Sequence, residues 1–271
     1  MSAAEPKPTR ILAVANQKGG VGKTTTAINL GTALAAVGSR VLLLDSDPQG
    51  NASTGLGISR AMRTKTFYDV LMEGVPALDA AVKTALPGLD LLPSDPDLSG
   101  VEVELGQTPR RSFRLRDAMA PIRAGHAYDY VLIDCPPSLG LLTINAMTAS
   151  DAVLAPLQCE FFALEGLTQL TRTIDLVRGS LNPALEIQGV VLTMYDRRNS
   201  LSAQVASDVR AHFGDTVYQT VIPRNVRVSE APSFGKPALI YDLKCAGSQA
   251  YIQLARELVG RERKRLRAQV S

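Results

Sequence analysis

Two lysines and a run of threonines surround a cluster of glycines in the stretch "NQKGGVGKTTT", from Asn16 to Thr26. Glycines let backbone N–H groups converge on phosphate oxygens, because no Cβ blocks their approach. A lysine beside such a loop neutralises phosphate charge, and a threonine hydroxyl after it ligates Mg²⁺. The stretch therefore predicts a nucleotide site in which Lys23 reaches the β- and γ-phosphates and Thr24 binds the metal. Lys18 is one lysine more than such a site needs.

The segments on either side of this loop have the right character to position it. Residues 11–15, "ILAVA", form a continuous apolar run that is typical of a buried parallel strand. Leu30 and Leu34 follow at helical spacing, which predicts a helix over residues 24–37 that is ended by Gly38. A strand, a glycine-rich loop and a helix N-terminus make a P-loop, in which the helix end adds partial positive charge.

The same alternation of apolar runs and helical patterns continues along the chain. Further strands are predicted at residues 40–45, 89–93, 130–134, 152–156, 187–195 and 217–223. Further helices are predicted at about 112–124, 163–179, 201–213 and 247–267. Strands that alternate with helices indicate βαβ units. We therefore expect an α/β fold, doubly wound, with a mostly parallel sheet and helices on both faces.

The composition indicates one folded unit. The 271 residues are 45% hydrophobic, which is enough for a sizeable core, and no linker separates two halves. We expect a short disordered lead-in at residues 1–9 and a single domain at 10–271 that ends in a basic helix. No apolar run approaches the roughly 20 residues of a membrane helix. The net charge of +3 permits nucleic-acid binding without arguing for it.

Carboxylates follow two of the predicted strands. One strand ends in "DSDPQGN", with Asp45 and Asp47, and another ends in "YVLIDCPPS", with Asp134. The carboxyl ends of parallel strands form the ligand edge of such a sheet, so these carboxylates are expected beside the phosphate loop. For both Asp45 and Asp47 the alternative interpretation is an Asx turn at the proline and glycine that follow.

The three motifs, in this order, resemble those of the ParA/MinD family of ATPases, whose deviant P-loop also occurs in the nitrogenase iron proteins. An ordinary P-loop has glycine where this chain has Gln17, and the extra Lys18 is typical of the deviant form. The late segments 190–202 and 221–237 resemble the chromosomal ParA branch nearly residue for residue. Further matches lie at 100–106 and 157–167, so the resemblance covers essentially residues 10–260.

The resemblance implies a role for each residue of the site. Lys23 would serve the nucleotide of its own subunit, whereas Lys18 would cross a dimer interface to the phosphates of the partner. Asp47 would orient or activate the attacking water, and Asp134 would hold Mg²⁺ through water, with Asp45 behind them. The residues implied to contact the nucleotide are Lys18, Gly19, Gly20, Val21, Gly22, Lys23, Thr24, Thr25, Met194, Pro223 and Asn225. The alternatives are a solvated charge for Lys18 and ordinary loop packing for the last three.

The resemblance also implies the activity, which is Mg²⁺-dependent hydrolysis of ATP to ADP and phosphate. ATP would join two subunits into a sandwich homodimer that binds double-stranded DNA without sequence preference through Arg198 and Arg227. A ParB-type centromere-binding partner would stimulate hydrolysis and so drive the segregation of a chromosome or plasmid. Such a protein would be cytoplasmic and associated with the nucleoid. The alternative for the two arginines is a solvated surface position.

Two other enzyme classes fit part of the pattern. An electron-transfer iron protein needs two cysteines per chain to hold a cluster at the dimer axis. Cys135 and Cys159 are available, but they stand in motifs that match ParA instead. A metabolic P-loop kinase gives no reason for Lys18.

A MinD-like, membrane-recruited regulator of cell division is the main alternative, because it shares the chemistry of the site. An interfacial helix needs a wide apolar face, and residues 260–271 offer only Leu266 and Val270 as bulky apolar side chains. No stable membrane association is therefore expected. For the basic segment 255–269 we favour a solvated helix end, followed by an additional DNA contact.

Overall fold

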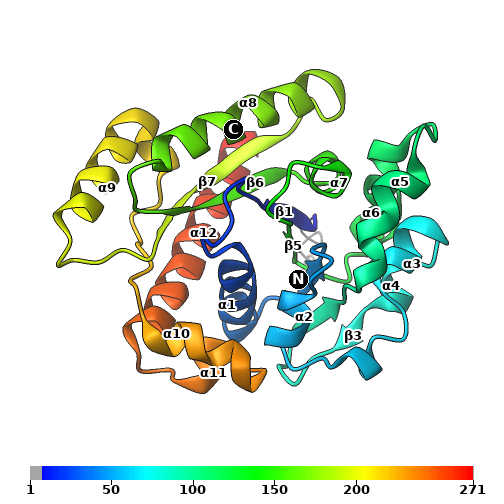
Figure 1. Ribbon diagram of the computed structural model, residues 1–271, viewed down its shortest axis with the longest axis horizontal. Helices are drawn as coiled ribbons and strands as arrows, with labels where there is room; N and C mark the ends of the chain where they lie inside the picture. Colours follow the sequence, from blue (N-terminus) through cyan, green and yellow to red (C-terminus); the bar gives the residue numbers. More distant parts are fainter. Residues whose placement is uncertain (1–7, 271) are drawn as a thin grey trace.

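The strands of the computed structural model, which describes residues 8–270, join in one sheet (Figure 1). Their order is β3-β4-β2-β5-β1-β6-β7, and neighbours are parallel except for the β3–β4 pair. The strands are β1 (Arg10–Val14), β2 (Val41–Asp45), β3 (Val82–Lys83), β4 (Leu89–Leu92), β5 (Tyr130–Asp134), β6 (Ala152–Gln158) and β7 (Glu186–Thr193). The mostly parallel sheet is confirmed. The short antiparallel β3 at its edge was not predicted.

The strand predicted at 217–223 is wrong. That segment pairs with the β7 region only through isolated bridges near its two ends. Between them, the N–H groups of Gln219 and Thr220 donate to the Glu257 carboxylate, at 2.9 and 3.0 Å. Tyr218 and Ile222 still donate to β7 carbonyls, so the C-terminal helix interrupts the pairing at the centre of the segment.

Helices cover both faces of the sheet, so the doubly wound arrangement is confirmed. On one face, α1 (Lys23–Ala36) and α12 (Ala246–Val270) lie side by side (Figure 1) and pack against each other. This layer also contains α2 (Asn51–Gly55), α10 (Val226–Glu230) and α11 (Ala238–Tyr241). The opposite layer contains α3 (Phe67–Met72), α4 (Ala77–Ala80), α5 (Val101–Leu105), α6 (Arg114–Gly125), α7 (Leu141–Ala149), α8 (Ala163–Ser180) and α9 (Ser200–Phe213). Each layer buries its own apolar cluster against the sheet.

The longer helices have the expected positions, and the short ones were missed. Gly38 ends the first helix as predicted, with φ of 91° and its N–H donating to the Ala35 carbonyl at 2.9 Å. The elements α2 to α5, α10 and α11 are too short to show a helical period in the sequence. Helix α7 buries nearly all of its residues, so it lacks the one-sided apolar pattern that marks a surface helix.

The C-terminal helix α12 is part of the core along most of its length. Tyr251 and Leu258 are buried in the same cluster as α1, and Glu262 forms a buried ion pair of 3.2 Å with Arg10 in β1. We propose on this basis that the expected domain, 10–271, behaves as one unit. Most of the expected lead-in at 1–9 lies outside the described residues, which begin at residue 8. No described helix is both long and apolar enough to cross a bilayer.

The carboxyl ends of β1, β2 and β5 meet at one edge of the sheet. Asp134 is in register with Asp45 on one side and with Val14 on the other. The phosphate loop that follows Val14 therefore begins beside both carboxylates. In doubly wound sheets this edge is where ligands bind.

Candidate functional site

Glycines shape the loop between β1 and α1 at positions that need a left-handed backbone. Gly20 and Gly22 have φ of 75° and 88°, and Gly22 is the N-cap residue of α1. No described side chain caps this helix end. Its first N–H groups therefore remain available to an anion, which the helix dipole also favours. The Thr193 hydroxyl at the end of β7 donates to the Val21 carbonyl at 2.8 Å and holds the loop in place.

Lys23 begins α1 and is largely buried. Its ammonium donates a hydrogen bond to the carbonyl oxygen of Lys18 at 3.0 Å. Burial lowers the pKa of the Lys23 ammonium, whereas the nearby carboxylates of Asp134 and Asp47 act in the opposite direction. These carboxylates favour the charged form of Lys23, which is the form that binds phosphate.

Asp45 is a buried carboxylate that supports the loop after β2. It accepts hydrogen bonds from the Ser53 N–H and hydroxyl, at 2.8 and 2.7 Å, and from the Asp47 N–H at 3.3 Å. Burial raises the pKa of Asp45 to about 6, while the hydrogen bonds from Ser53 oppose that shift. Since its oxygens are already engaged, Asp45 orients the loop and is not positioned as a ligand.

Asp134 differs from Asp45 in lacking partners. Both of its carboxylate oxygens are buried, and neither has a hydrogen-bond partner among the described residues. Burial, followed by repulsion from Asp45, raises the pKa of Asp134 well above its ordinary value; Thr24 opposes this shift without reaching hydrogen-bond geometry. A buried charge without a partner is costly, so this carboxylate has a strong preference for a cation. Together with the Thr24 hydroxyl it fits Mg²⁺, which takes oxygen ligands and keeps several waters.

A cavity of about 520 Å³ runs along the phosphate loop. The predicted residues on its wall are Gly19, Gly20, Gly22, Lys23, Thr24, Thr25, Asp47 and Met194. The structure therefore brings most of the predicted phosphate contacts together with Asp47. Val21 is instead buried under the loop, where only its backbone could meet a phosphate.

Asp47 is held in an Asx turn and also lines this cavity. Its Oδ1 atom accepts the Gln49 N–H at 3.0 Å, which is the turn named as the alternative interpretation. The turn and a catalytic role are compatible, because one oxygen fixes the side chain and no described hydrogen bond reaches the other.

A second, smaller cavity of about 120 Å³ adjoins the first and shares Gly22, Thr25 and Met194 with it. Pro223 and Asn225 also lie on its wall, so the three predicted base contacts are brought together. Met194 has φ of 51°, which is uncommon for a residue other than glycine. Asn225 Oδ1 accepts two backbone N–H groups at the start of α10, so only its amide nitrogen is left to contact a base.

The Lys18 side chain forms an ion pair with Glu160 of the same subunit, on the loop after β6. Lys18 is about two-fifths exposed and does not line the phosphate cavity. Its ammonium is therefore directed away from the phosphates that Lys23 would bind. The cross-subunit role of Lys18 stays a prediction.

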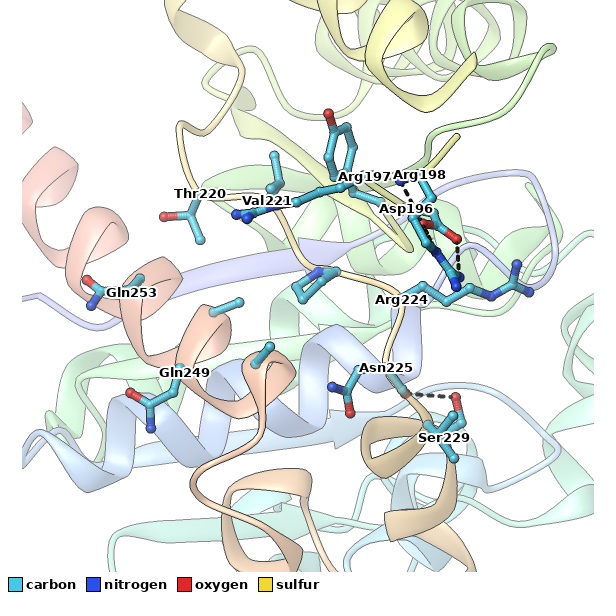
Figure 2. Close-up of a pocket in the computed structure, with 15 residues that line it drawn as sticks. Asp196, Arg197, Arg198, Thr220, Val221, Arg224, Asn225, Ser229, Gln249 and Gln253 are labelled. Atoms are coloured by element: carbon cyan, nitrogen blue, oxygen red, sulfur yellow. Dashed lines mark hydrogen bonds and ion pairs between the residues drawn. The ribbon is translucent and has the colours of Figure 1, made fainter. Parts of the chain in front are cut away.

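Three arginines gather at a cleft of about 980 Å³ (Figure 2). Arg197, Arg198 and Arg224 line it together with the first turns of α12, and Figure 2 shows Gln249 and Gln253 on the α12 side. The cleft shares Pro223, Arg224, Asn225 and Ser229 with the smaller cavity described above. One short segment thus forms a wall of both the predicted base pocket and the arginine-lined cleft.

Both predicted DNA contacts carry an acidic partner. Arg198 donates two hydrogen bonds to the Asp196 carboxylate, at 3.0 and 2.8 Å, and its side chain is almost fully exposed. Arg227 lies on α10 outside the cleft and pairs with Glu230 at 3.2 Å. Exposed ion pairs of this kind are worth about 0–1 kcal/mol, so a phosphate can replace the carboxylate at little cost.

The environment of the two cysteines opposes an iron–sulfur site. Cys135 and Cys159 are both buried. Burial raises the pKa of the Cys135 thiol beyond its ordinary range and raises that of Cys159 to about 11. Cluster ligands are thiolates, which need the opposite shift.

Several residues of the site were not predicted. Ser53, Arg63 and Ser94 hold the Asp47 loop, although they lie in other segments and belong to no recognisable spacing. Glu160 lies in the matched segment 157–167, but no role was predicted for it. Its acidic side chain was the only feature in the sequence that indicated a partner for a lysine. These residues became visible only once the fold had brought them to the loop.

Comparison with known proteins supports this assignment of the fold. The profile of the AAA domain family matches residues 9–187. The chromosome partitioning protein ParA of Caulobacter vibrioides is 78% identical over 258 residues, which is 95% of this chain and 97% of that protein. The sporulation initiation inhibitor protein Soj of Bacillus subtilis is 53% identical and is covered to 98%, over 92% of this chain.

A solved structure has the same architecture. It is cobyrinic acid a,c-diamide synthase from Mycobacterium smegmatis with a bound ATP analogue and magnesium. The TM-score is 0.82 at 40% sequence identity, over 93% of this chain and 94% of that one.

Proposed function

Because the chain belongs to the ParA family of chromosome-partitioning ATPases, we propose that it is a nucleotide-gated DNA-binding protein. ATP joins two subunits into a sandwich dimer, and the dimer binds double-stranded DNA without sequence preference. A ParB-type partner stimulates hydrolysis to ADP and phosphate, which releases the protein from DNA. Repeated binding and release drive the segregation of a chromosome or plasmid, so the protein acts in the cytoplasm on the nucleoid.

The phosphate loop binds ATP in this proposal. The N–H groups from Gly19 to Thr25 and the Lys23 ammonium contact the β- and γ-phosphates, and Met194, Pro223 and Asn225 contact the base. Asp47 orients the attacking water at the far side of the γ-phosphate. Phosphoryl transfer needs a placed water and neutralised charge rather than covalent help from the protein.

Mg²⁺ supplies part of that charge neutralisation when it is bound. Support for a magnesium site comes from Asp134, whose buried carboxylate oxygens have no partner among the described residues. Thr24 contributes its hydroxyl, and the described chain offers no cluster of three His, Cys, Asp or Glu side chains that could hold a metal alone. With so few protein ligands, the remaining ligands of the magnesium ion would be nucleotide phosphates and water.

Lys18 completes the partner's site across the dimer interface. Its ion pair with Glu160 is partly exposed and costs about 1 kcal/mol to break, whereas a polyphosphate offers several negative charges at once. Lys18 therefore exchanges Glu160 for the phosphates of the second subunit as the dimer forms.

The observation that carries the nucleotide-gated DNA function is the wall shared by the base pocket and the arginine-lined cleft. Pro223, Arg224 and Asn225 border both cavities. A base that packs on one side of this segment adjusts the arginines on the other. Arginine forks bind backbone phosphates whatever the base sequence, which gives salt-sensitive binding of any DNA.

The test uses Asp47→Ala protein, which is expected to bind ATP without hydrolysing it. Its affinity for arbitrary double-stranded DNA is measured with ATP and with ADP over a series of salt concentrations. Tight binding with ATP only, weakened steeply by salt, supports the proposal. Absence of DNA binding in both states contradicts it. Anionic liposomes would then test the MinD-like alternative, in which the same ATPase cycle controls attachment to a membrane.

A further inference from the structure

We propose that Ser94 is a positioning residue for ATP hydrolysis, because its hydroxyl holds the backbone of the loop that carries Asp47. Ser94 lies just beyond β4 and is fully buried. Its Oγ atom donates a hydrogen bond to the carbonyl oxygen of Asp47. The inference rests on the catalytic role proposed for Asp47 and extends it to the neighbouring strand.

Each polar group of Ser94 forms a hydrogen bond, either to Asp47 or to a residue that supports the Asp47 loop. Its hydroxyl binds the Asp47 carbonyl, and its N–H donates to the Ser53 hydroxyl oxygen at 3.2 Å. Its carbonyl oxygen accepts from the Arg63 guanidinium at 3.1 Å. One of these bonds reaches the Asp47 loop directly, and the other two join Ser94 to Ser53 and Arg63, which also hold that loop.

The bonds continue to the strand that ends in Asp45. The Ser53 hydroxyl, which accepts from Ser94, donates in turn to the Asp45 carboxylate at 2.7 Å. Asp45 then accepts the Asp47 N–H. The Asp47 peptide is therefore held on both sides, at its N–H by Asp45 and at its carbonyl by Ser94.

Arg63 contacts the segments around the Asp47 loop and further restricts that loop. Its guanidinium reaches the Thr54 hydroxyl at 2.9 Å and the Ile58 carbonyl at 3.0 Å, besides Ser94. It also packs directly on Gly50, where a Cβ would collide with it. Gly50 has φ of 64°, so a side chain there would be strained as well. The loop from Asp47 to Gly50 thus has little freedom to move.

A fixed loop matters because Asp47 must place one water in line with the γ-phosphate. A misplacement of about 1 Å can cost up to a hundredfold in rate. Asp47 is not on a strand, so its position depends on the bonds that its own backbone makes. Ser94 is the donor that links this backbone to the rigid end of β4.

The experiment measures the hydrolysis step in a single turnover, together with ATP affinity and thermal stability. Ser94→Ala is expected to slow hydrolysis by about tenfold or more while ATP affinity stays within about twofold. Ser94→Thr keeps a hydroxyl donor and should recover most of the rate. Ser94→Cys nearly keeps the volume but is a weak donor, so it should resemble Ser94→Ala even if the alanine variant folds poorly.

Ser150→Ala is the matched control. Ser150 is also a buried serine whose hydroxyl donates to a backbone carbonyl, that of Ala146 at 2.7 Å. It precedes β6 and so lies at the amino edge of the sheet, away from the phosphate loop. The control should lose stability with an unchanged hydrolysis rate. The inference is overturned if Ser94→Ala and Ser94→Cys hydrolyse ATP at the normal rate, or lose rate only in proportion to ATP affinity.

A double variant separates this inference from the role of Asp47 itself. If Ser94 acts through Asp47, then Asp47→Ala with Ser94→Ala should be no slower than Asp47→Ala alone. Additive losses would show that Ser94 affects the rate by another route and would overturn the inference. Full activity of Asp47→Ala would instead refute the proposed function, whatever the behaviour of Ser94.

Discussion

Lys23 Nζ lies 3.0 Å from the carbonyl oxygen of Lys18, so a hydrogen bond joins the two lysines of the phosphate loop. The Lys18 side chain is directed elsewhere, to Glu160. Lys18 thus supplies a backbone acceptor that orients Lys23, while its own ammonium lies apart from the phosphate cavity. Because the two side chains occupy different places, their removal should have different consequences.

Lys23→Ala should abolish ATP binding. The variant loses the cation that faces the phosphates, and we expect the dissociation constant to rise at least about a hundredfold, or ~2.7 kcal/mol. Calorimetric titration with ATP measures the effect, with the exposed Lys83→Ala on β3 as control. Normal affinity in Lys23→Ala would rule out the phosphate-loop assignment.

Lys18→Ala should block the ATP-dependent dimer and leave binding of ATP to the single subunit within about twofold of the wild type. The backbone carbonyl that orients Lys23 survives this substitution, which is why the affinity is retained. Light scattering of the variant with ATP, in an Asp47→Ala background, gives its mass. A dimer at the wild-type concentration would refute the cross-subunit role.

Arg198→Glu should weaken binding to all DNA sequences alike. The side chain is almost fully exposed, so its reversal should disturb the surface and not the core. Each phosphate contact that is lost should make the log–log dependence of affinity on salt shallower by about 0.9. The control is Arg172→Glu on α8, another exposed arginine far along the chain from the cleft. An unchanged salt slope in Arg198→Glu would remove this residue from the DNA surface.

Asp134→Asn should stabilise the metal-free protein and abolish hydrolysis. The substitution removes a buried charge that has no described partner, and we expect a gain of about 1–3 kcal/mol in the free energy of unfolding at pH 7. Asp45→Asn is the matched control, and it should lower the free energy of unfolding instead of raising it. Its carboxylate accepts the Ser53 and Asp47 donors, and an amide cannot accept all of them. Denaturant unfolding in the presence of a chelator measures both, and a destabilised Asp134→Asn would contradict the assignment.

The same two carboxyl groups set the direction of the pH dependence. The pKa of Asp45 is raised from 3.8 to about 6 in the folded protein, so the native state binds this proton more tightly than the unfolded chain does. The resulting stability is fully present below pH 3.8 and is lost as the pH rises through about 6. Asp134 acts in the same direction. The free energy of unfolding of the metal-free protein should therefore decline over this window, and less steeply in Asp134→Asn. Equal slopes would show that Asp134 does not contribute.

The phosphate loop could be predicted from the sequence because its chemistry is local. The residues that would contact the phosphates are neighbours in the chain, namely Gly20, Gly22, Lys23 and Thr24. The strand before them and the helix after them can be recognised from their apolar patterns. The parallel sheet also followed from alternation alone, since crossover connections leave few other arrangements. With the strand order, the carboxylates of Asp45 and Asp134 had to meet at one edge.

The tertiary structure decided what lies around these residues. The segment 217–223 has the composition of a strand, but Glu257 on α12 accepts the N–H groups of Gln219 and Thr220 at its centre. Ser94 reaches the Asp47 carbonyl, and Glu160 reaches Lys18, from segments far away in the chain. Such contacts leave no period or motif in the sequence, because a single hydrogen bond or ion pair requires only one suitable side chain at the right place. That place exists only after the strands have been ordered and the helices packed on them.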